Sequence, residues 1–359
     1  MRDTHTIALF DVEEKTVGLA FLSLAEHPTL LWSARTRFSV DAPRKSMDHL
    51  LHEADLRGIA KPSRTIVTLE PPLYHAETRF VHKTVSEPKP LTKALFAEFT
   101  ASLPELAHED EDTFEKQLLS VRLNGYLFTD YHNRVAREVD ISLYEAVAPK
   151  NLVAAIGPGV ILRSASFTTA EVLRGILKGK ESFLFLDVGD GETTVSLVEH
   201  GSLIWTTQIL FGTRSALTVL AHAYGTIPEE TESALRSYQK KTLDPERLAQ
   251  LEQAMAEAET GWVDALRKVL DERIGHMRLP EELYIVGDER LLPFFAKAVN
   301  AQDTAHYTYT NVPITVVSVT SPMLASFCKS SIGVAQVDGG ETRFLMQAAY
   351  ELQTRKQNA

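Results

Sequence analysis

Residues 183–205 read FLFLDVGDGETTVSLVEHGSLIW, and residues 7–24, IALFDVEEKTVGLAFLSL, repeat the same pattern earlier in the chain. Each begins with an apolar strand that ends in Asp-Val and continues through a short polar turn into a second apolar strand. A third strand follows near a tryptophan in both cases. The aspartates at the two strand ends are Asp11 and Asp187. This repetition predicts two similar halves facing one cleft, and it indicates phosphate and metal chemistry or the remnant of it.

The overall composition is that of a folded soluble protein. With 359 residues, of which 44% are hydrophobic and 24% charged, the chain has room for two or three domains. Its net charge of −11 argues against a nucleic-acid surface, which needs a basic face. The single cysteine, Cys328, excludes an intrachain disulfide and fits a reducing cytoplasm. The sequence has neither a signal peptide nor an apolar run long enough to span a bilayer, so we expect a cytoplasmic protein.

Changes of pattern along the chain predict two lobes and two insertions. The stretch after Lys61-Pro62 mixes strands with one main helix, and residues 215–280 are helical throughout. The predicted units are a first lobe core at 1–62, an inserted subdomain at 63–150, a return to the first lobe at 151–182, a second lobe core at 183–214, its helical insertion at 215–280, more of the second lobe core at 281–320, and closing helices at 321–359.

Four local predictions lie within these units. The segment SEPKP at 86–90 is typical of a turn, and residues 144–148 favour the start of a helix. Thr168 or Thr169 is expected to cap a helix that runs to Leu177. Ser321-Pro322 is expected to open an apolar helix that continues through Phe327 to Val334.

The order of these parts resembles the actin-like ATPase superfamily, and in particular its FtsA and PilM type. Asp187-Val-Gly-Asp-Gly-Glu-Thr-Thr is similar to the second phosphate loop, IVGDERLLPFF at 285–295 to the adenosine loop, and SPMLASF at 321–327 to the closing helix. The stretches IVTLEPPLYHAETR and VRLNGYLFTDYHNRVAREVDISLY, within 63–150, look like the strand–helix–strand–strand subdomain of PilM-type proteins. The resemblance implies a two-lobed α/β fold, ribonuclease H-like and duplicated, with that FtsA-type subdomain inserted.

The resemblance also implies a nucleotide site between the lobes. Its cofactors would be ATP and Mg²⁺, with Asp11 and Asp187 as magnesium ligands through water; the alternative is that both only cap turns at strand ends. No catalytic residue is assigned. The candidate cofactor-binding residues are Asp11, Lys15, Thr16, Asp187, Gly189, Gly191, Thr193, Thr194 and Gly287. Glycine suits such loops because it allows close approach and positive φ, but tight turns need it without any ligand.

The three loops of this site carry additional or substituting carboxylates. They are Glu13, Glu14, Asp190, Glu192, Asp288 and Glu289. One like-charge contact at ~4 Å costs about 4 kcal/mol at an effective dielectric constant of about 20. A few such contacts would remove micromolar affinity, which is worth roughly 8 kcal/mol. The sequence therefore predicts weak or absent ATP binding and no efficient hydrolysis.

These features favour a cytoplasmic scaffold of the PilM type, which docks the cytoplasmic segment of a membrane protein in type IV pilus assembly. We expect the partner at the 63–150 subdomain or its groove against the first lobe, where an extended peptide can add to a strand. Membrane association is then indirect, at the inner face of the membrane. The tail, with Phe344, Leu345 and Leu352 on one face, favours docking on the protein body over an FtsA-like membrane helix.

Two alternatives stay open. One is an FtsA-like cell-division adaptor or filament, since no feature of the sequence decides the oligomeric state. The other belongs to a different class: a working Mg-ATP-dependent ATPase or kinase of the same fold. That reading requires a first loop compatible with phosphate and a group that positions the attacking nucleophile.

Overall fold

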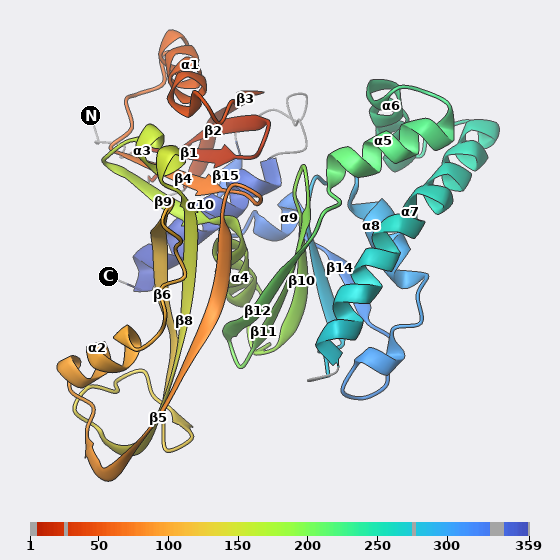
Figure 1. Ribbon diagram of the computed structural model, residues 1–359. Helices are drawn as coiled ribbons and strands as arrows, with labels where there is room; N and C mark the ends of the chain where they lie inside the picture. The colour runs from red at the N-terminus through yellow and green to blue at the C-terminus, as the bar shows by residue number, and fades with distance from the viewer. Residues whose placement is uncertain (1–5, 25–27, 275–277, 331–340, 358–359) are drawn as a thin grey trace.

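The computed structural model describes residues 6–24, 28–274, 278–330 and 341–357. Within them the chain forms three β-sheets, two of which are the centres of two lobes and the third of which projects from the first lobe (Figure 1). Helices cover both faces of the two lobe sheets, so their central strands, such as β1 (Thr6–Val12), are buried along their whole length.

The first lobe has a six-stranded sheet in the order β15-β3-β2-β1-β4-β9. β1, β2 and β3 form an antiparallel meander, whereas β4 and β9 run parallel to β1. The remaining strands of this sheet are β2 (Thr16–Ser23), β3 (Thr29–Arg37), β4 (Arg64–Leu69), β9 (Val160–Ser164) and β15 (Lys329–Ser330).

The second lobe repeats this topology in the order β12-β11-β10-β13-β14. β10, β11 and β12 form the antiparallel meander, and β13 and β14 are parallel to β10. The strands are β10 (Phe183–Val188), β11 (Thr193–Glu199), β12 (Ser202–Ile209), β13 (Glu282–Gly287) and β14 (Thr315–Ser318).

A shared irregularity supports the duplication predicted from the sequence. In each meander the second and third strands slip by one residue just beyond a pair that contains tryptophan: Phe21 with Trp32 in one, Leu197 with Trp205 in the other. Such β-bulges are specific local features, so their recurrence at matching positions indicates that the two hairpins are copies of one design.

Helices between the sheets join the lobes into one body. Figure 1 places α4 (Ala165–Ile176) and α10 (Glu341–Gln357) between the two sheets. Phe183 and Phe185 of β10 point into the same apolar core as α4 and α10, whereas Leu184 and Leu186 point into the core of the second lobe. The tail helix is thus docked on the protein, as predicted, because Phe344 and Leu345 are buried.

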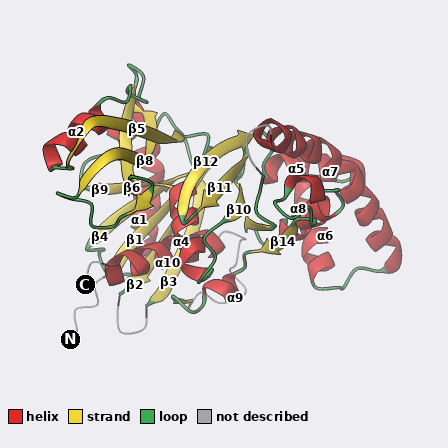
Figure 2. Ribbon diagram, turned by 90° about the horizontal axis from the view of Figure 1, so that it is seen from below, coloured by secondary structure: helices red, strands yellow, loops and turns green. Residues whose placement is uncertain are grey.

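The outer helices cover the far faces of the lobes. On the outer side of the second lobe lie α5 (Thr213–Tyr224), α6 (Pro228–Gln239), α7 (Pro245–Ile274) and α8 (Leu292–Asn300), which are gathered together in Figure 2. The remaining helical elements are α1 (Pro43–Leu56), α3 (Lys150–Ile156), a short 3₁₀ turn (Ala305–Tyr307) and α9 (Ser321–Leu324). No helix in the described ranges is both long and apolar enough to cross a bilayer.

The projecting sheet is antiparallel and has the order β5-β8-β6-β7. Its elements are β5 (His75–Pro90), α2 (Lys93–Ala101), β6 (Glu111–Leu123), β7 (Tyr126–Leu127) and β8 (Val135–Pro149). α2 packs on one face over a small separate core that includes Val81, Phe99 and Ile141. β5 also touches the second lobe, where Thr78 donates a hydrogen bond to the Leu203 carbonyl over 2.6 Å.

The four local predictions are wrong in their boundaries. Residues 86–90 continue β5, and residues 144–148 continue β8 rather than starting a helix. Helix α4 begins at Ala165, after Ser164, so Thr168 and Thr169 lie inside it. The helix that opens at Ser321 ends at Leu324, and Val334 lies outside the described residues.

Candidate functional site

The three loops singled out from the sequence meet at one cleft between the lobes. β10 and β13 are parallel neighbours, so the residues that follow them gather at one edge of the second-lobe sheet, and Glu13, which follows β1, lines the same cavity from the first lobe. A cavity of about 240 Å³ lies there. Its lining residues are Glu13, Thr16, Arg35, Val188, Gly189, Asp190, Thr213, Leu217, Glu232, Asp288, Arg290 and Arg343.

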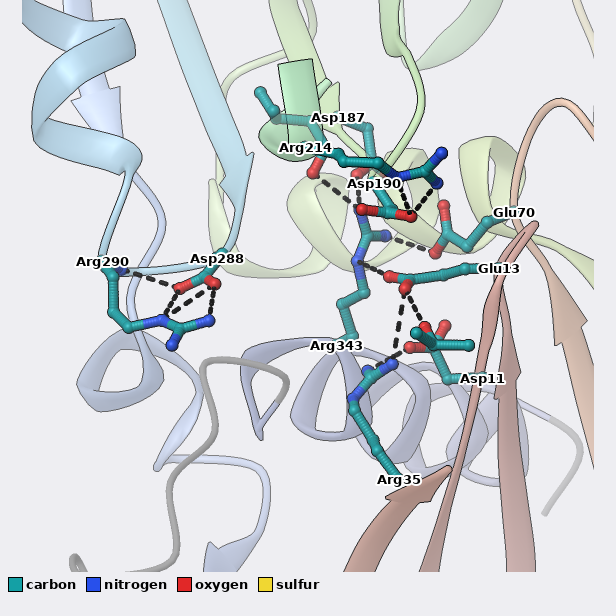
Figure 3. Close-up of polar contacts among 12 residues, drawn as sticks. Asp11, Glu13, Arg35, Glu70, Asp187, Asp190, Arg214, Asp288, Arg290 and Arg343 are labelled. Carbon is teal, nitrogen blue, oxygen red and sulfur yellow. Dashed lines mark hydrogen bonds and ion pairs between the residues drawn. The ribbon is translucent and has the colours of Figure 1, made fainter. Parts of the chain in front are cut away.

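Asp11 lies at the first-lobe side of this cleft and is fully buried. Arg35 of β3 forms an ion pair with it through Nη2, and the Arg35 Nη1 atom lies 3.7 Å from Glu13 Oε2 (Figure 3). Glu13 also accepts a hydrogen bond from the Thr16 hydroxyl, which closes the β1–β2 turn. Asp11 therefore faces a guanidinium group from its own sheet.

Asp187 lies at the corresponding place in the second lobe and is also buried. The Thr169 hydroxyl donates to its Oδ2 atom over 2.9 Å, and Arg343 Nη2 donates to Oδ1 over 2.8 Å. The same guanidinium forms an ion pair with Glu70, which directly follows β4. Figure 3 shows Arg343 rising from α10 between the carboxylates of the two lobes.

Two further arginines pair with loop carboxylates. Arg214, at the start of α5, forms an ion pair with Asp190 and lies 3.3 Å from Glu14 Oε2 of the first lobe. Arg290 forms an ion pair with Asp288 and another, at 2.9 Å, with Glu232 of α6. Figure 3 shows the pairs Arg214–Asp190 and Arg290–Asp288.

The six loop carboxylates thus do not form the repelling set that the sequence predicted. Glu13, Glu14, Asp190 and Asp288 each pair with an arginine, and Glu289 turns away to accept hydrogen bonds from Ser321 and Thr342. Glu192 is buried, and its Oε1 atom has no hydrogen-bond partner in the structure. The prediction counted negative charges without their partners, most of which come from distant elements, whereas Arg290 lies two positions from Asp288.

The arginines were the functional residues that sequence reasoning missed. Arg214 follows Gly212 by two positions, and Arg290 follows Asp288 by two. The closeness of both arginines to loops of the site could therefore have been recognised from the sequence. Arg35 and Arg343 carry no such local signal, because only the folded sheet and helix bring them to the cleft.

The remaining candidate residues lie in or near the second loop. Gly189 donates its N–H to the Glu192 carbonyl over 2.9 Å, and Gly191 lies against Glu14 of the other lobe. Thr193 donates to the Phe211 carbonyl over 2.7 Å, and Thr194 is buried in β11 opposite Asp187. These residues do come together at the cleft, but their polar groups bond to protein.

Gly287 and Lys15 mark the other two loops. Gly287 has φ of +153°, and a Cβ atom there would lie 2.8 Å from the Val188 carbonyl, so the close approach of β13 to β10 requires glycine. Lys15 is exposed at the tip of the first loop, while Glu13 and Glu14 pair with arginines instead.

A magnesium ion would have to compete for oxygens that these arginines hold. Mg²⁺ binds carboxylate oxygens at about 2.0–2.1 Å and keeps several waters in octahedral geometry. Asp11 and Asp187, the two candidate ligands, each meet a guanidinium group through one oxygen, whereas the Oδ1 atom of Asp11 is buried without a hydrogen-bond partner. Among the described residues, no cluster of three or more His, Cys, Asp or Glu side chains has the arrangement of a metal site. The residues present do not fit the ion in this conformation.

The buried Glu192 carboxyl makes stability depend on pH. Burial, with a smaller contribution from Glu14, raises the pKa of Glu192 from 4.5 to about 7. Its protonated form favours folding, so this contribution is fully present below about pH 4.5 and is lost as the pH rises through about 7. Glu192→Gln should therefore raise the free energy of unfolding at pH 8 by up to about 3 kcal/mol. Urea unfolding of both proteins between pH 5 and 8 measures this.

The exposed Glu252 of α7 provides the control for this experiment. Glu252→Gln should follow the wild-type pH profile, because it leaves the buried Glu192 unchanged. Identical pH profiles for the wild type and Glu192→Gln would contradict the prediction.

Comparison with known proteins identifies the fold. No protein-family model and no curated protein sequence matches the chain. Among solved structures, a chain of the PilM–PilN type IV pilus biogenesis complex has a TM-score of 0.64 at 13% identity, over 98% of this chain and 99% of that chain. A Bacteroides thetaiotaomicron protein with an actin-like ATPase fold and unknown function has a TM-score of 0.48 at 10% identity, over 98% and 99%.

The similarity to the PilM–PilN chain confirms the predicted fold class. The protein has a two-lobed, actin-like α/β fold with ribonuclease H-like mixed sheets and an extra antiparallel sheet. At 13% identity this similarity concerns the fold alone.

Proposed function

We propose that this chain is a cytoplasmic actin-like scaffold that binds a protein partner, with a role most like that of PilM in type IV pilus assembly, and that its cleft binds Mg-ATP weakly or not at all. The observation that carries the proposal is that the arginines lining the cleft are already paired with its carboxylates, as in Arg343 with Glu70 and Asp187. The fold similarity to a chain of the PilM–PilN complex is consistent with it.

The backbone of the second loop supports the nucleotide part of the proposal. A phosphate needs N–H groups aimed at it, preferably at the start of a helix. Here the first N–H groups of α5 are used differently, because Thr213 and Arg214 donate to the carbonyls of Gly189 and Asp190 over 2.9 and 3.0 Å. Only glycine fits at position 212, because a Cβ atom there would lie 2.5 Å from both of these carbonyl oxygens.

A groove beside the projecting sheet supports the partner part. A cavity of about 250 Å³ lies among β6, α4, the β11–β12 turn and α10. Its lining residues are Gln117, Leu118, Leu119, Phe167, Glu171, Arg174, Gly201, Tyr350, Gln353 and Thr354. Leu118 is 41% exposed at its edge. The groove lies between the projecting subdomain and the first lobe, and the β11–β12 turn of the second lobe borders it.

The geometry of β6 suits an extended peptide. Within the described chain, β6 pairs with β8 on one side, and on the other side with the two-residue β7 at Arg122 and Leu123 only. Its backbone near Leu118 can therefore accept a further strand, while the partly exposed Leu118 and Leu119 offer apolar surface beside it. We place the cytoplasmic segment of a membrane protein in this groove.

Cross-linking in cells that make the full-length protein tests the partner site. A photo-reactive residue at Gln117 should cross-link to a membrane protein through its cytoplasmic segment, identified by mass spectrometry. Leu118→Glu should abolish this product, whereas Glu252→Lys on the outer face of α7 should leave it unchanged. A product that is insensitive to Leu118→Glu, or that contains only soluble proteins, would contradict the proposed role.

A further inference from the structure

The arginine at the start of the last helix contacts both lobes at once. Arg343 lies in the first turn of α10, and only 7% of its side chain is exposed. Glu70 extends from the sheet of the first lobe, and Asp187 and Val188 belong to β10 of the second. Because Glu70 and Asp187 are held by different sheets, the guanidinium links the two sheets directly.

Each nitrogen of this guanidinium has a partner. Nη1 pairs with Glu70, Nη2 donates to Asp187 Oδ1 over 2.8 Å and to the Val188 carbonyl over 3.0 Å, and Nε lies 3.9 Å from Glu13 Oε1. A planar guanidinium is suited to joining several acceptors in this way, whereas an ammonium group is not. The site therefore selects for arginine and not for positive charge alone.

The charge around the site requires a cation. Four carboxylates, those of Asp11, Glu13, Glu70 and Asp187, surround two guanidinium groups, those of Arg35 and Arg343. Burial alone would lower the pKa of Arg343, but Asp187 and Glu70 offset this and the pKa is raised well above its ordinary value, so the group stays charged. Removing it would leave buried carboxylates of two lobes facing each other.

We infer that Arg343 is an intramolecular ligand that holds the two lobes closed from inside the cleft, with no need for a nucleotide or a metal ion. Arg343 lies between the strand ends of both lobes, where the resemblance to the actin-like ATPase superfamily implies a bound nucleotide. The inference concerns the free protein and stands independently of the proposed partner and of its groove.

Distances between spin labels on the two lobes test this directly. Asp55→Cys on α1 and Glu252→Cys on α7 place labels on exposed positions of the first and second lobes. The native Cys328 is buried, and burial raises the pKa of its thiol to about 11, so it competes poorly for the label. The labelled protein that keeps Arg343 should give one narrow distribution of distances between the two labels in the absence of nucleotide, and the same distribution with Mg-ATP.

Arg343→Ala should add a second population at longer distances. Arg343→Lys, which keeps the charge but cannot bridge both carboxylates, should do the same to a smaller extent, and it decides the question if the alanine variant does not fold. Arg290→Ala is the matched control, because its ion pairs with Asp288 and Glu232 lie within the second lobe. That variant should keep the wild-type distribution.

Two results would overturn the inference. A wild-type distribution in both folded Arg343 variants would mean that the apolar core around α4 and α10 holds the lobes without the arginine. A broad wild-type distribution that narrows with Mg-ATP would mean that the nucleotide closes the cleft.

Discussion

Arg343→Ala should lower the free energy of unfolding by about 3–5 kcal/mol, the range for removing one partner of a buried ion pair. The loss arises chiefly because Glu70 and Asp187 stay buried after their common partner is gone. Burial raises the pKa of Glu70 well above its ordinary value even with Arg343 present, so the variant should relieve part of the cost by taking up a proton there. Urea unfolding at pH 7 measures the change.

A double-mutant cycle with Glu70→Gln distinguishes the loss of the Arg343–Glu70 ion pair from a general disruption of the structure. The two substitutions together should cost less than the sum of the single losses, because the double variant no longer leaves a charged Glu70 without its partner. A loss of under about 1 kcal/mol for Arg343→Ala, or additive effects in the cycle, would show that the guanidinium contributes like an exposed residue.

Trp262→Ala should have an effect of similar size, about 3–5 kcal/mol, in the apolar core of the second lobe. Trp262 of α7 is fully buried, packs edge-on against Phe295 at 4.9 Å between ring centroids, and donates its indole N–H to the Thr193 hydroxyl over 3.3 Å. The substitution leaves a cavity beside β11 and removes the bond to Thr193. The free energy of unfolding by urea is again the measurement.

Trp32 of β3 is the control for that substitution. It is half-buried and packs against Phe21, so Trp32→Ala should cost only about 1–2 kcal/mol for the apolar area it exposes. Equal losses for the two tryptophans would show that α7 does not form part of the second-lobe core.

The repeated hairpins made the architecture predictable from the sequence. Apolar strands that end in Asp11 and Asp187 are local patterns, and two copies of one pattern restrict the topology strongly. The wrong boundaries have physical causes. Residues 144–148 include Glu145 and Ala146, which favour helix, but they are buried between β5 and β6, and sheet packing overrides that preference. The prolines of 86–90 fit a strand because β5 is at the edge of its sheet.

The cleft was predictable in position but not in its electrostatics. The loop residues reveal where negative charge lies, since they are contiguous in sequence. Their partners are separated from them by 24 positions for Arg35 and Asp11, 24 for Arg214 and Asp190, and 156 for Arg343 and Asp187. The physical reason that we now give for the proposed weak nucleotide binding is accordingly different: the arginines of the cleft are paired with its carboxylates, and a nucleotide would have to break those pairs.

Titration calorimetry of the full-length protein with ATP and magnesium tests this central claim most directly. Our account predicts no saturable heat up to about 1 mM nucleotide, which corresponds to a binding free energy weaker than about −4 kcal/mol. Saturable binding with a dissociation constant in the micromolar range would contradict it, since the arginine–carboxylate pairs would then yield readily to a triphosphate.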